Sequence, residues 1–259
     1  MNVKAGRLWE LSILLTATLW GVSALAQTPE IKEKPPMYSY ASFWTIPRAQ
    51  WPEMAKVDAA DKPILDKALA DGTIIGYGND TNVVHASDGD THADWWSSMS
   101  IAGLLTVLEQ LQNSSTTTAP FLQSATKHWD EILVGKYYNW RSGSWHGLYT
   151  YAGFYRLSAN APDNAVDVLS KNLVAPVLEK LLADGTLVEY EIDTEAVHTD
   201  APGRFWIFSL AANAQAIDKI NAAIRDAIKS DPLGGVAFNS MVDLSAHRDY
   251  MAKANASYK

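Results

Sequence analysis

Hydrophobic residues along this chain change their spacing in a fixed order, and that order occurs twice. A segment with two-residue alternation is followed by one with helical spacing, then by two alternating segments, a second helical segment and a final alternating one. The clearest repeat is the sequence LADGT at Leu69–Thr73, which recurs unchanged at Leu182–Thr186. Because the flanking patterns repeat in the same order, the sequence predicts a tandem duplication.

The first copy is expected to contain four strands and two helices. Aromatic and β-branched residues at 38–46, 73–77, 93–98 and 129–140 predict the strands, the second of which extends toward His85. Apolar residues at helical spacing over 52–70 and 101–111 predict the helices. Gly72 supplies the left-handed residue that ends the first helix, and Pro63 should kink or divide that helix.

The second copy follows the same order. We expect strands at 149–157, 186–198, 205–208 and 236–244, and helices at 162–183 and 217–228. Pro176 lies 113 positions after Pro63, which predicts a kink at the same depth in both first helices. Trp206 aligns with Trp96 at an offset of 110, so the hairpin loop of the second copy should be shorter.

The strand-helix-strand-strand-helix-strand order is the ferredoxin-like arrangement, in which both helices cover one face of a four-stranded antiparallel sheet. The bare face of each sheet is then covered by its twin. We therefore predict an α+β fold of two tandem ferredoxin-like βαββαβ repeats. This order resembles the dimeric α+β barrel superfamily, which includes small monooxygenases and haem-degrading and chlorite dismutase-like proteins. The resemblance implies a pseudo-dimeric α+β barrel in one chain, able to exist as a monomer, with a ligand or cofactor cavity between the sheets or between sheet and helices.

The N-terminus has the pattern of a secretory signal peptide. A basic start with Lys4 and Arg7 precedes an apolar run, and Ala24–Ala26 ends it with small residues. Cleavage is expected after Ala26, which predicts an exported protein, periplasmic or secreted. The domain plan is a signal peptide at 1–26, a leader at 27–36, a first repeat at 37–146, a second repeat at 147–250 and a polar tail at 251–259.

Composition narrows the choice of partners. Without residues 1–26 the chain has 19 basic and 28 acidic side chains, a net charge of −9. Such a surface repels nucleic acid and anionic lipid, and no further segment is long and apolar enough for stable membrane insertion. The absence of cysteine excludes disulfides and a thiolate nucleophile.

Aromatic and imidazole residues found in both copies are the candidates for a ligand-binding site. Their positions are Tyr40 and Tyr151, Tyr77 and Tyr190, His85 and His198, and Trp96 and Trp206. On an unbroken strand, residues eight positions apart share a face, so each Tyr-His pair could line one pocket between the sheets. A packing role explains these residues equally, because duplication copies structural residues as readily as functional ones.

Two other segments carry polar or aromatic residues that could bind a ligand. Asp88, Asp90, His92 and Asp94 have the spacing of cation ligands, but Asp-Gly-Asp is also ordinary turn chemistry and the second copy lacks the cluster, so no metal site is predicted. The segment Trp140–Gly147 joins the copies and could stack on a planar ligand or clamp the two halves together. The chain has no phosphate loop, Gly-x-Ser-x-Gly elbow or His-Glu-x-x-His pattern.

Three functions remain open from the sequence. The first is a module that binds a small apolar or aromatic ligand between its two sheets, favoured by ten Trp and eleven Tyr. The second is a haem-binding or cofactor-free monooxygenase-like enzyme, in which His85, His198, His128 or His146 serves as iron ligand or base. The third is an envelope module that binds another protein. No cofactor is predicted for the first and third.

Overall fold

The computed structural model describes residues 31–259, except 115–119, 121 and 200–201. Its strands are β1 (Met37–Thr45), β2 (Gly76–Asn82), β3 (His92–Ser98), β4 (Lys127–Trp140), β5 (Gly143–Arg156), β6 (Leu187–Glu195), β7 (Arg204–Ala211) and β8 (Arg248–Tyr258). Its α-helices are α1 (Trp51–Asp71), α2 (Ile101–Gln112), α3 (Ala165–Leu169), α4 (Ala175–Ala183), α5 (Ala214–Ser230) and α6 (Pro232–Met241).

The eight strands form one closed barrel in the order β1-β3-β2-β8-β5-β7-β6-β4, and every pairing is antiparallel. The order β4-β1-β3-β2 is the ferredoxin-like sheet of the first copy, and β8-β5-β7-β6 is that of the second. The two sheets join at the β2–β8 and β4–β6 pairs. This confirms the predicted pseudo-dimeric α+β barrel.

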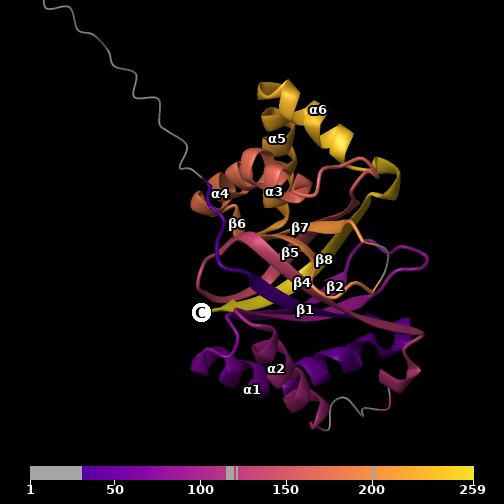
Figure 1. Cartoon of the computed structure of the whole chain (residues 1–259). Coiled ribbons are helices and arrows are strands. Elements are labelled where there is room, and N and C mark those ends of the chain that lie inside the picture. Colours follow the sequence, from indigo (N-terminus) through magenta and orange to yellow (C-terminus); the bar gives the residue numbers. More distant parts are fainter. Residues whose placement is uncertain (1–30, 115–119, 121, 200–201) are drawn as a thin grey trace, which may run out of the picture. The chain divides into compact units, whose positions relative to one another are not determined.

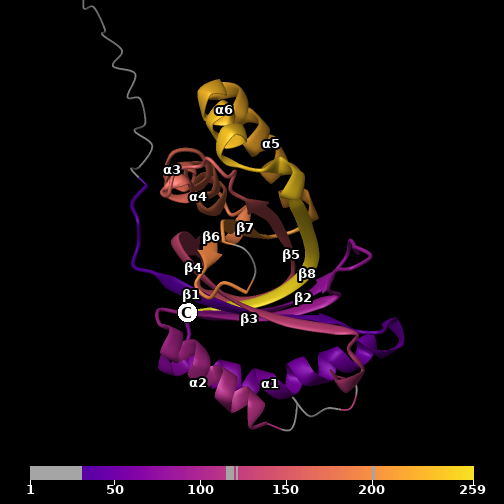
Figure 2. The same cartoon turned by 45° about the vertical axis from the view of Figure 1, so that its right-hand side comes forward.

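The helices lie on two opposite sides of the barrel (Figures 1 and 2). The pair α1 and α2 covers the first sheet, and α3 to α6 cover the second. Each side has its own apolar core: Leu104 and Val107 of α2 pack on the first sheet, while Leu178 of α4 and Ile220 of α5 pack on the second. Cavities can therefore form inside the barrel or on either helix-covered face.

The repeated LADGT segment builds the same turn twice. Gly72 and Gly185 both follow a helix and have φ values of 82° and 80°, in the left-handed region that suits glycine. Oδ1 of Asp71 accepts the N–H of Thr73 at 3.0 Å, and Oδ1 of Asp184 makes the equivalent bond at 2.8 Å. The same local chemistry thus ends the first helix of each copy and directs the chain into the next strand.

Strand alternation also holds as predicted. Ser39, Ala41 and Phe43 of β1 line the interior of the barrel, whereas Tyr40 and the alternate residues that follow it face the helices. The two faces of each strand therefore serve two separate spaces.

The prediction for the last strand of the second copy is wrong. Residues 232–241 form α6, and the last strand is β8, which takes up 251–258, the segment expected to be a polar tail. Apolar residues of 236–244 have no decisive period, whereas β8 alternates small buried residues such as Ala252 and Ala254 with exposed polar ones. In addition, β5 begins at Gly143, so it crosses the boundary expected between 146 and 147.

The prolines behave differently in the two copies. Pro63 lies inside a continuous α1, whereas Pro176 lies at the start of α4, directly after a π-helical turn at Ser170–Val174. A proline leaves a carbonyl of the preceding turn without its usual donor, and the wider π turn accommodates this in the second copy. The α-helix is thus interrupted in the second copy and continuous through Pro63 in the first.

The pairing of Trp206 with Trp96 is also wrong. Tyr40 of β1 lies opposite Trp96, and its counterpart Tyr151 of β5 lies opposite Ser209. Ser209 therefore occupies the position of Trp96 in the second sheet, while Trp206 is three residues away and faces the barrel interior.

The expected signal peptide at 1–26 and the start of the leader lie outside the described residues. No helix among the described residues combines the length and the apolar character needed to cross a membrane.

Candidate active site

The space inside the barrel is almost filled, with a cavity of about 60 Å³. A cavity of about 410 Å³ lies between the first sheet and α1 and α2, and we call it the first cavity. A cavity of about 330 Å³ lies between the second sheet and α4, α5 and α6, and we call it the second cavity. The pocket expected between the two sheets is therefore small, because side chains of both sheets fill most of that space. The larger cavities lie between sheet and helices, the other position that the resemblance implied.

Aromatic side chains form much of the wall of the first cavity. They are Tyr40, Trp44, Tyr77, Trp95, Trp96 and Trp145. The rings of Tyr40 and Trp96 stack with centroids 4.4 Å apart, and Nε1 of Trp96 donates to the carbonyl oxygen of Leu104 at 3.1 Å. These contacts fix the rings, so the wall presents a preformed planar surface to a ligand.

A polar cluster lies on this wall where β1 pairs with β4. Nε2 of His128 is 3.0 Å from Oγ of Ser42 and 3.2 Å from Oδ1 of Asp130, and its ring stacks on Trp44 with centroids 3.7 Å apart. Burial and the neighbouring Asp130 raise the pKa of Tyr40. Burial opposes ionisation of Asp130, but hydrogen bonds from His128 and Ser42 outweigh it and lower the pKa of this carboxyl. At neutral pH the cluster therefore holds the Asp130 carboxylate and the protonated phenol of Tyr40 beside the His128 ring.

Carboxyl groups from α1 and β3 form a second polar part of the cavity. Burial and the nearby Asp61 raise the pKa of Asp58 to about 7, and burial together with Asp58 raises the pKa of Asp94. Oδ1 of Asp58 is buried and makes no hydrogen bond within the described residues. A carboxyl group that titrates near neutral pH can both give and take a proton.

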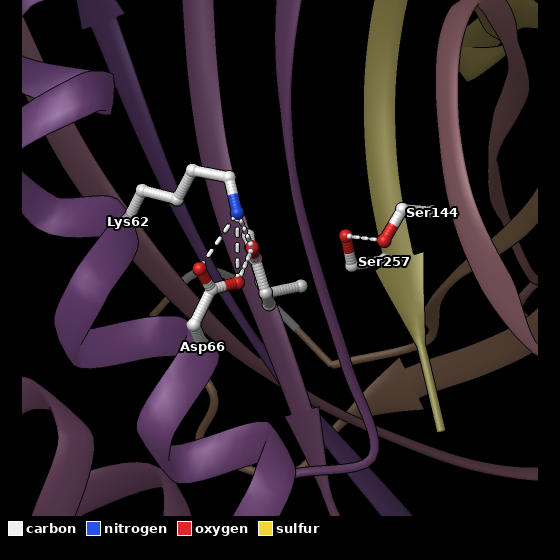
Figure 3. Close-up of polar contacts among 5 residues, drawn as sticks. Lys62, Asp66, Ser144 and Ser257 are labelled. Atoms are coloured by element: carbon white, nitrogen blue, oxygen red, sulfur yellow. Dashed lines mark hydrogen bonds and ion pairs between the residues drawn. The ribbon is translucent and has the colours of Figure 1, made fainter.

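A hydrogen-bond network anchors Tyr77 at the edge of the cavity. Its hydroxyl donates to Oδ1 of Asp66 at 2.6 Å, and Nζ of Lys62 lies 3.3 Å from the same hydroxyl. Figure 3 shows Lys62 and Asp66 projecting from α1, with the bond between Ser257 of β8 and Ser144 of β5 nearby. Because the Tyr77 hydroxyl is already paired, this residue holds α1 to the sheet.

The polar cluster of the first cavity has a counterpart in the second. Nε2 of His247 lies 3.2 Å from Oδ1 of Asp249, and its ring stacks on Tyr155 with centroids 4.5 Å apart. Burial and Asp249 raise the pKa of Tyr151, the counterpart of Tyr40. Gly153 stands in the position of Ser42, so the second cluster lacks the serine hydroxyl. The duplication has therefore produced two related but unequal sites.

The predicted site residues are distributed over several places. Tyr40, Tyr77 and Trp96 line the first cavity and Tyr151 lines the second. The two expected Tyr-His pairs do not form: both histidines lie beyond the ends of their strands and are exposed. His85 lies against Trp51, and His198 lines a separate depression. Tyr190 packs under α4 and donates to Oε1 of Glu179 at 2.7 Å, and Trp206 is fully buried in the barrel.

Sequence reasoning did not recognise that a His-x-Asp pair occurs in both copies. His128-Trp-Asp130 and His247-Arg-Asp249 are the same His-x-Asp pattern at the start of the fourth strand of each copy. The repeat is visible in the sequence. It was not recognised because the last strand was expected at 236–244, which leaves His247 and Asp249 after that strand. The residues that the histidines stack on, Trp44 and Tyr155, belong to the first strand of each copy.

Two of the four histidines named for haem, His128 and His146, line the first cavity, whereas His85 and His198 do not. Nε2 of His128 faces Ser42 and Asp130, so this nitrogen is not directed at an iron. His146 is exposed, with Nδ1 3.2 Å from Oδ1 of Asn255.

The side chains of the acidic segment at 88–94 point to different surroundings and do not converge on one site. Asp90 accepts a hydrogen bond from Nδ2 of Asn82 at 3.1 Å, Nδ1 of His92 lies 3.0 Å from Oγ1 of Thr91, and Asp94 lines the first cavity. Within the described residues, no group of three His, Asp or Glu side chains is arranged to hold a metal ion.

The segment between the copies connects both halves. Nε1 of Trp140 donates to the backbone oxygen of Lys259 at 3.0 Å, and Trp145 packs with Leu148 and Ala256 in the barrel core while also lining the first cavity. These contacts favour the clamp interpretation, with one tryptophan shared by the site.

No family model matches the sequence, and no curated protein matches it. Solved structures match over most of their length. A candidate monooxygenase from Lactobacillus acidophilus has a TM-score of 0.62 at 11% identity and covers 87% of this chain and 97% of its own. A candidate monooxygenase from Fusobacterium nucleatum has a TM-score of 0.64 at 7% identity, with 87% and 95% covered. An anthrone oxidase-like protein has a TM-score of 0.53 at 11% identity, with 87% and 94% covered. At these identities the likeness concerns the fold: the chain has the dimeric α+β barrel fold, with both halves of the barrel in one polypeptide.

Proposed function

We propose that the first cavity binds a small aromatic molecule with a weakly acidic proton and catalyses its oxidation by dioxygen without a cofactor. The observation that carries this proposal is the His128–Asp130 pair set into the aromatic wall of a cavity of about 410 Å³. A cavity of this size is within the usual range for small-molecule sites. Structural neighbours named as monooxygenases and as anthrone oxidase-like support the reaction class by analogy of fold alone.

In this proposal His128 is the base. The Asp130 carboxylate, whose pKa is lowered, stabilises the imidazolium that forms when His128 takes a proton from the ligand. Tyr40 stays protonated because its pKa is raised, and its hydroxyl helps to hold Asp130 in place. The aromatic wall orients the ligand ring, and burial keeps the resulting carbanion away from bulk water.

The proposed oxidation needs dioxygen as its only co-substrate. A ligand of the form R₂CH₂, acidified by a neighbouring ring carbonyl, loses a proton to His128, and the electron-rich carbanion then reacts with O₂. The net reaction is R₂CH₂ + O₂ → R₂C=O + H₂O. One oxygen atom enters the product and the other leaves as water after protonation, for which the carboxyl group of Asp58 is available nearby.

Anthrone is a suitable probe because it has this acidic CH₂ group between aromatic rings. Oxygen uptake and product absorbance are measured with the protein lacking residues 1–26. We expect His128→Gln to lower the rate by about 100-fold or more, while quenching of tryptophan fluorescence by anthrone persists. Asp218→Asn, an exposed carboxylate of α5, is the matched control and should leave both signals unchanged.

If anthrone quenches the fluorescence of the parent protein but no oxygen is consumed, the protein binds the ligand without oxidising it. That outcome favours the second candidate function, a ligand-binding protein. If the parent protein shows no quenching and no oxygen uptake, the first cavity is not a site for aromatic ligands and the proposal is wrong.

We propose that the protein is exported after cleavage behind Ala26 and that it is a monomer. The pattern at 1–26 supports export, and a barrel closed within one chain supports the monomer. Expression of the full sequence in a bacterium should place a protein that starts at Gln27 in the periplasmic fraction or the medium, as read by mass spectrometry. A protein that retains residues 1–26 would contradict the proposed cleavage and export. A dimer mass in light scattering would contradict the proposed monomer.

A further inference from the structure

The second cavity has walls of a different chemical kind from those of the first. Aliphatic side chains are more prominent in its wall, among them Val177, Ile207, Ile220 and Ile224 of α4, β7 and α5. Ser209 stands in the position that Trp96 fills in the first sheet, which removes a large ring from the sheet side. No tryptophan of the described residues lines this cavity, and the rings of Tyr151, Tyr155, Phe238 and His247 share its wall with branched aliphatic side chains.

The mouth of the second cavity is apolar as well. Ile224, Ile228 and Leu244 line the cavity and yet remain 40%, 46% and 51% exposed. Exposed aliphatic side chains that surround an opening are typical of sites for hydrophobic ligands. The described chain leaves this mouth open to a small molecule from solution.

One end of the cavity is polar. Here Asp249, whose side chain is 56% exposed, lies beside His247, and the hydroxyl-bearing rings of Tyr151 and Tyr155 are close by. Burial and the Asp249 charge raise the pKa of Tyr155 to about 12, so this phenol remains a hydrogen-bond donor. A carboxylate at this end repels an anionic ligand, while the phenols and the amide of Asn239 can bond to a neutral oxygen.

We propose that the second cavity is a separate binding site for an uncharged aliphatic molecule with one oxygen-bearing end, such as a medium-chain alcohol. This inference is independent of the reaction proposed for the first cavity. It assigns the two halves of the duplicated chain to two ligand classes, aromatic in the first and aliphatic in the second.

Calorimetric titration of the protein lacking residues 1–26 with 1-octanol and with octanoate tests this. We expect one saturable octanol site and, for octanoate, binding weaker by about tenfold or more. Ala227→Phe fills the second cavity from α5 and should weaken octanol binding by about tenfold or more. Ala59→Phe, the same change on α1 at the first cavity, is the matched control and should leave octanol binding unchanged.

A second variant tests the charge argument without filling the cavity. Asp249→Asn should strengthen octanoate binding by about fivefold or more, because it removes the repelling carboxylate. The proposal is overturned if octanol does not bind, if Ala59→Phe weakens octanol binding and Ala227→Phe does not, or if octanoate binds as tightly as octanol to the parent protein. Circular dichroism and melting curves confirm that each variant is folded, and a misfolded Ala227→Phe leaves the Asp249→Asn result to decide.

Discussion

At the scale of single residues, the two copies share a tyrosine-carboxylate hydrogen bond, but its exposure to solvent differs between them. Tyr77 donates to Asp66 and Tyr190 donates to Glu179, each pair separated by 11 positions along the chain. Both bonds tie the first helix of a copy to its second strand. Both tyrosines are buried, but the first bond is nearer to solvent at its acceptor, because the Asp66 side chain is 50% exposed whereas Glu179 is half-buried. The same bond should therefore contribute differently to stability.

We predict that Tyr190→Phe lowers the free energy of unfolding by about 2 kcal/mol, because the hydroxyl of a buried ring loses its hydrogen bond to the half-buried carboxyl group of Glu179. Tyr77→Phe should cost less than about 1 kcal/mol, since water can replace its hydroxyl at Asp66. Urea denaturation followed by circular dichroism measures both. Equal losses in the two variants would show that burial does not separate the two pairs.

At the scale of elements, strands β2 and β6 direct carboxyl groups into the barrel. Asp80 of β2 accepts a hydrogen bond from Oγ1 of Thr150 at 2.7 Å, and Oε2 of Glu191 of β6 accepts one from Oγ of Ser39 at 2.9 Å. Burial raises the pKa of both carboxyls, that of Asp80 from 3.8 to about 7. The folded barrel therefore holds protons that the unfolded chain releases at lower pH.

This sets the sign of a pH dependence. A carboxyl whose folded pKa is raised stabilises the fold below its unfolded pKa, and that contribution is lost as pH rises through the folded pKa. We predict that stability falls between pH 5 and pH 8, and that Asp80→Asn makes this fall smaller by on the order of 2 kcal/mol. Urea denaturation at both pH values measures it. An unchanged fall in the variant would show that Asp80 is ionised in the folded protein at pH 5.

At the scale of the whole molecule, β8 closes the barrel. It pairs with β2 of the first copy and β5 of the second, so the two sheets share it as one of their two junctions. It also supplies Ala254, Ala256 and Tyr258 to the core beneath Trp95. The segment that the sequence suggested was a tail is thus essential to both halves.

We predict that removing residues 248–259 abolishes the cooperative unfolding transition, because β2 and β5 would both become open edges. Thermal melting and gel filtration measure the outcome. A truncated protein that melts like the parent would mean that the barrel is stable without this junction.

The sequence by itself determined the duplication, the order of all the elements but the last, the turns at Gly72 and Gly185 and the sets of residues that share a strand face. These follow from local periodicity and backbone sterics, which act within a few residues. Only the tertiary structure decided which face of each strand points into the barrel, because a two-residue period is the same for either face. Closure of the barrel then placed carboxyl groups inside it, moved the cavities to the helix side and brought His128 onto Trp44, 84 positions away. Such a contact depends on strand pairing across the whole chain, which no local pattern encodes.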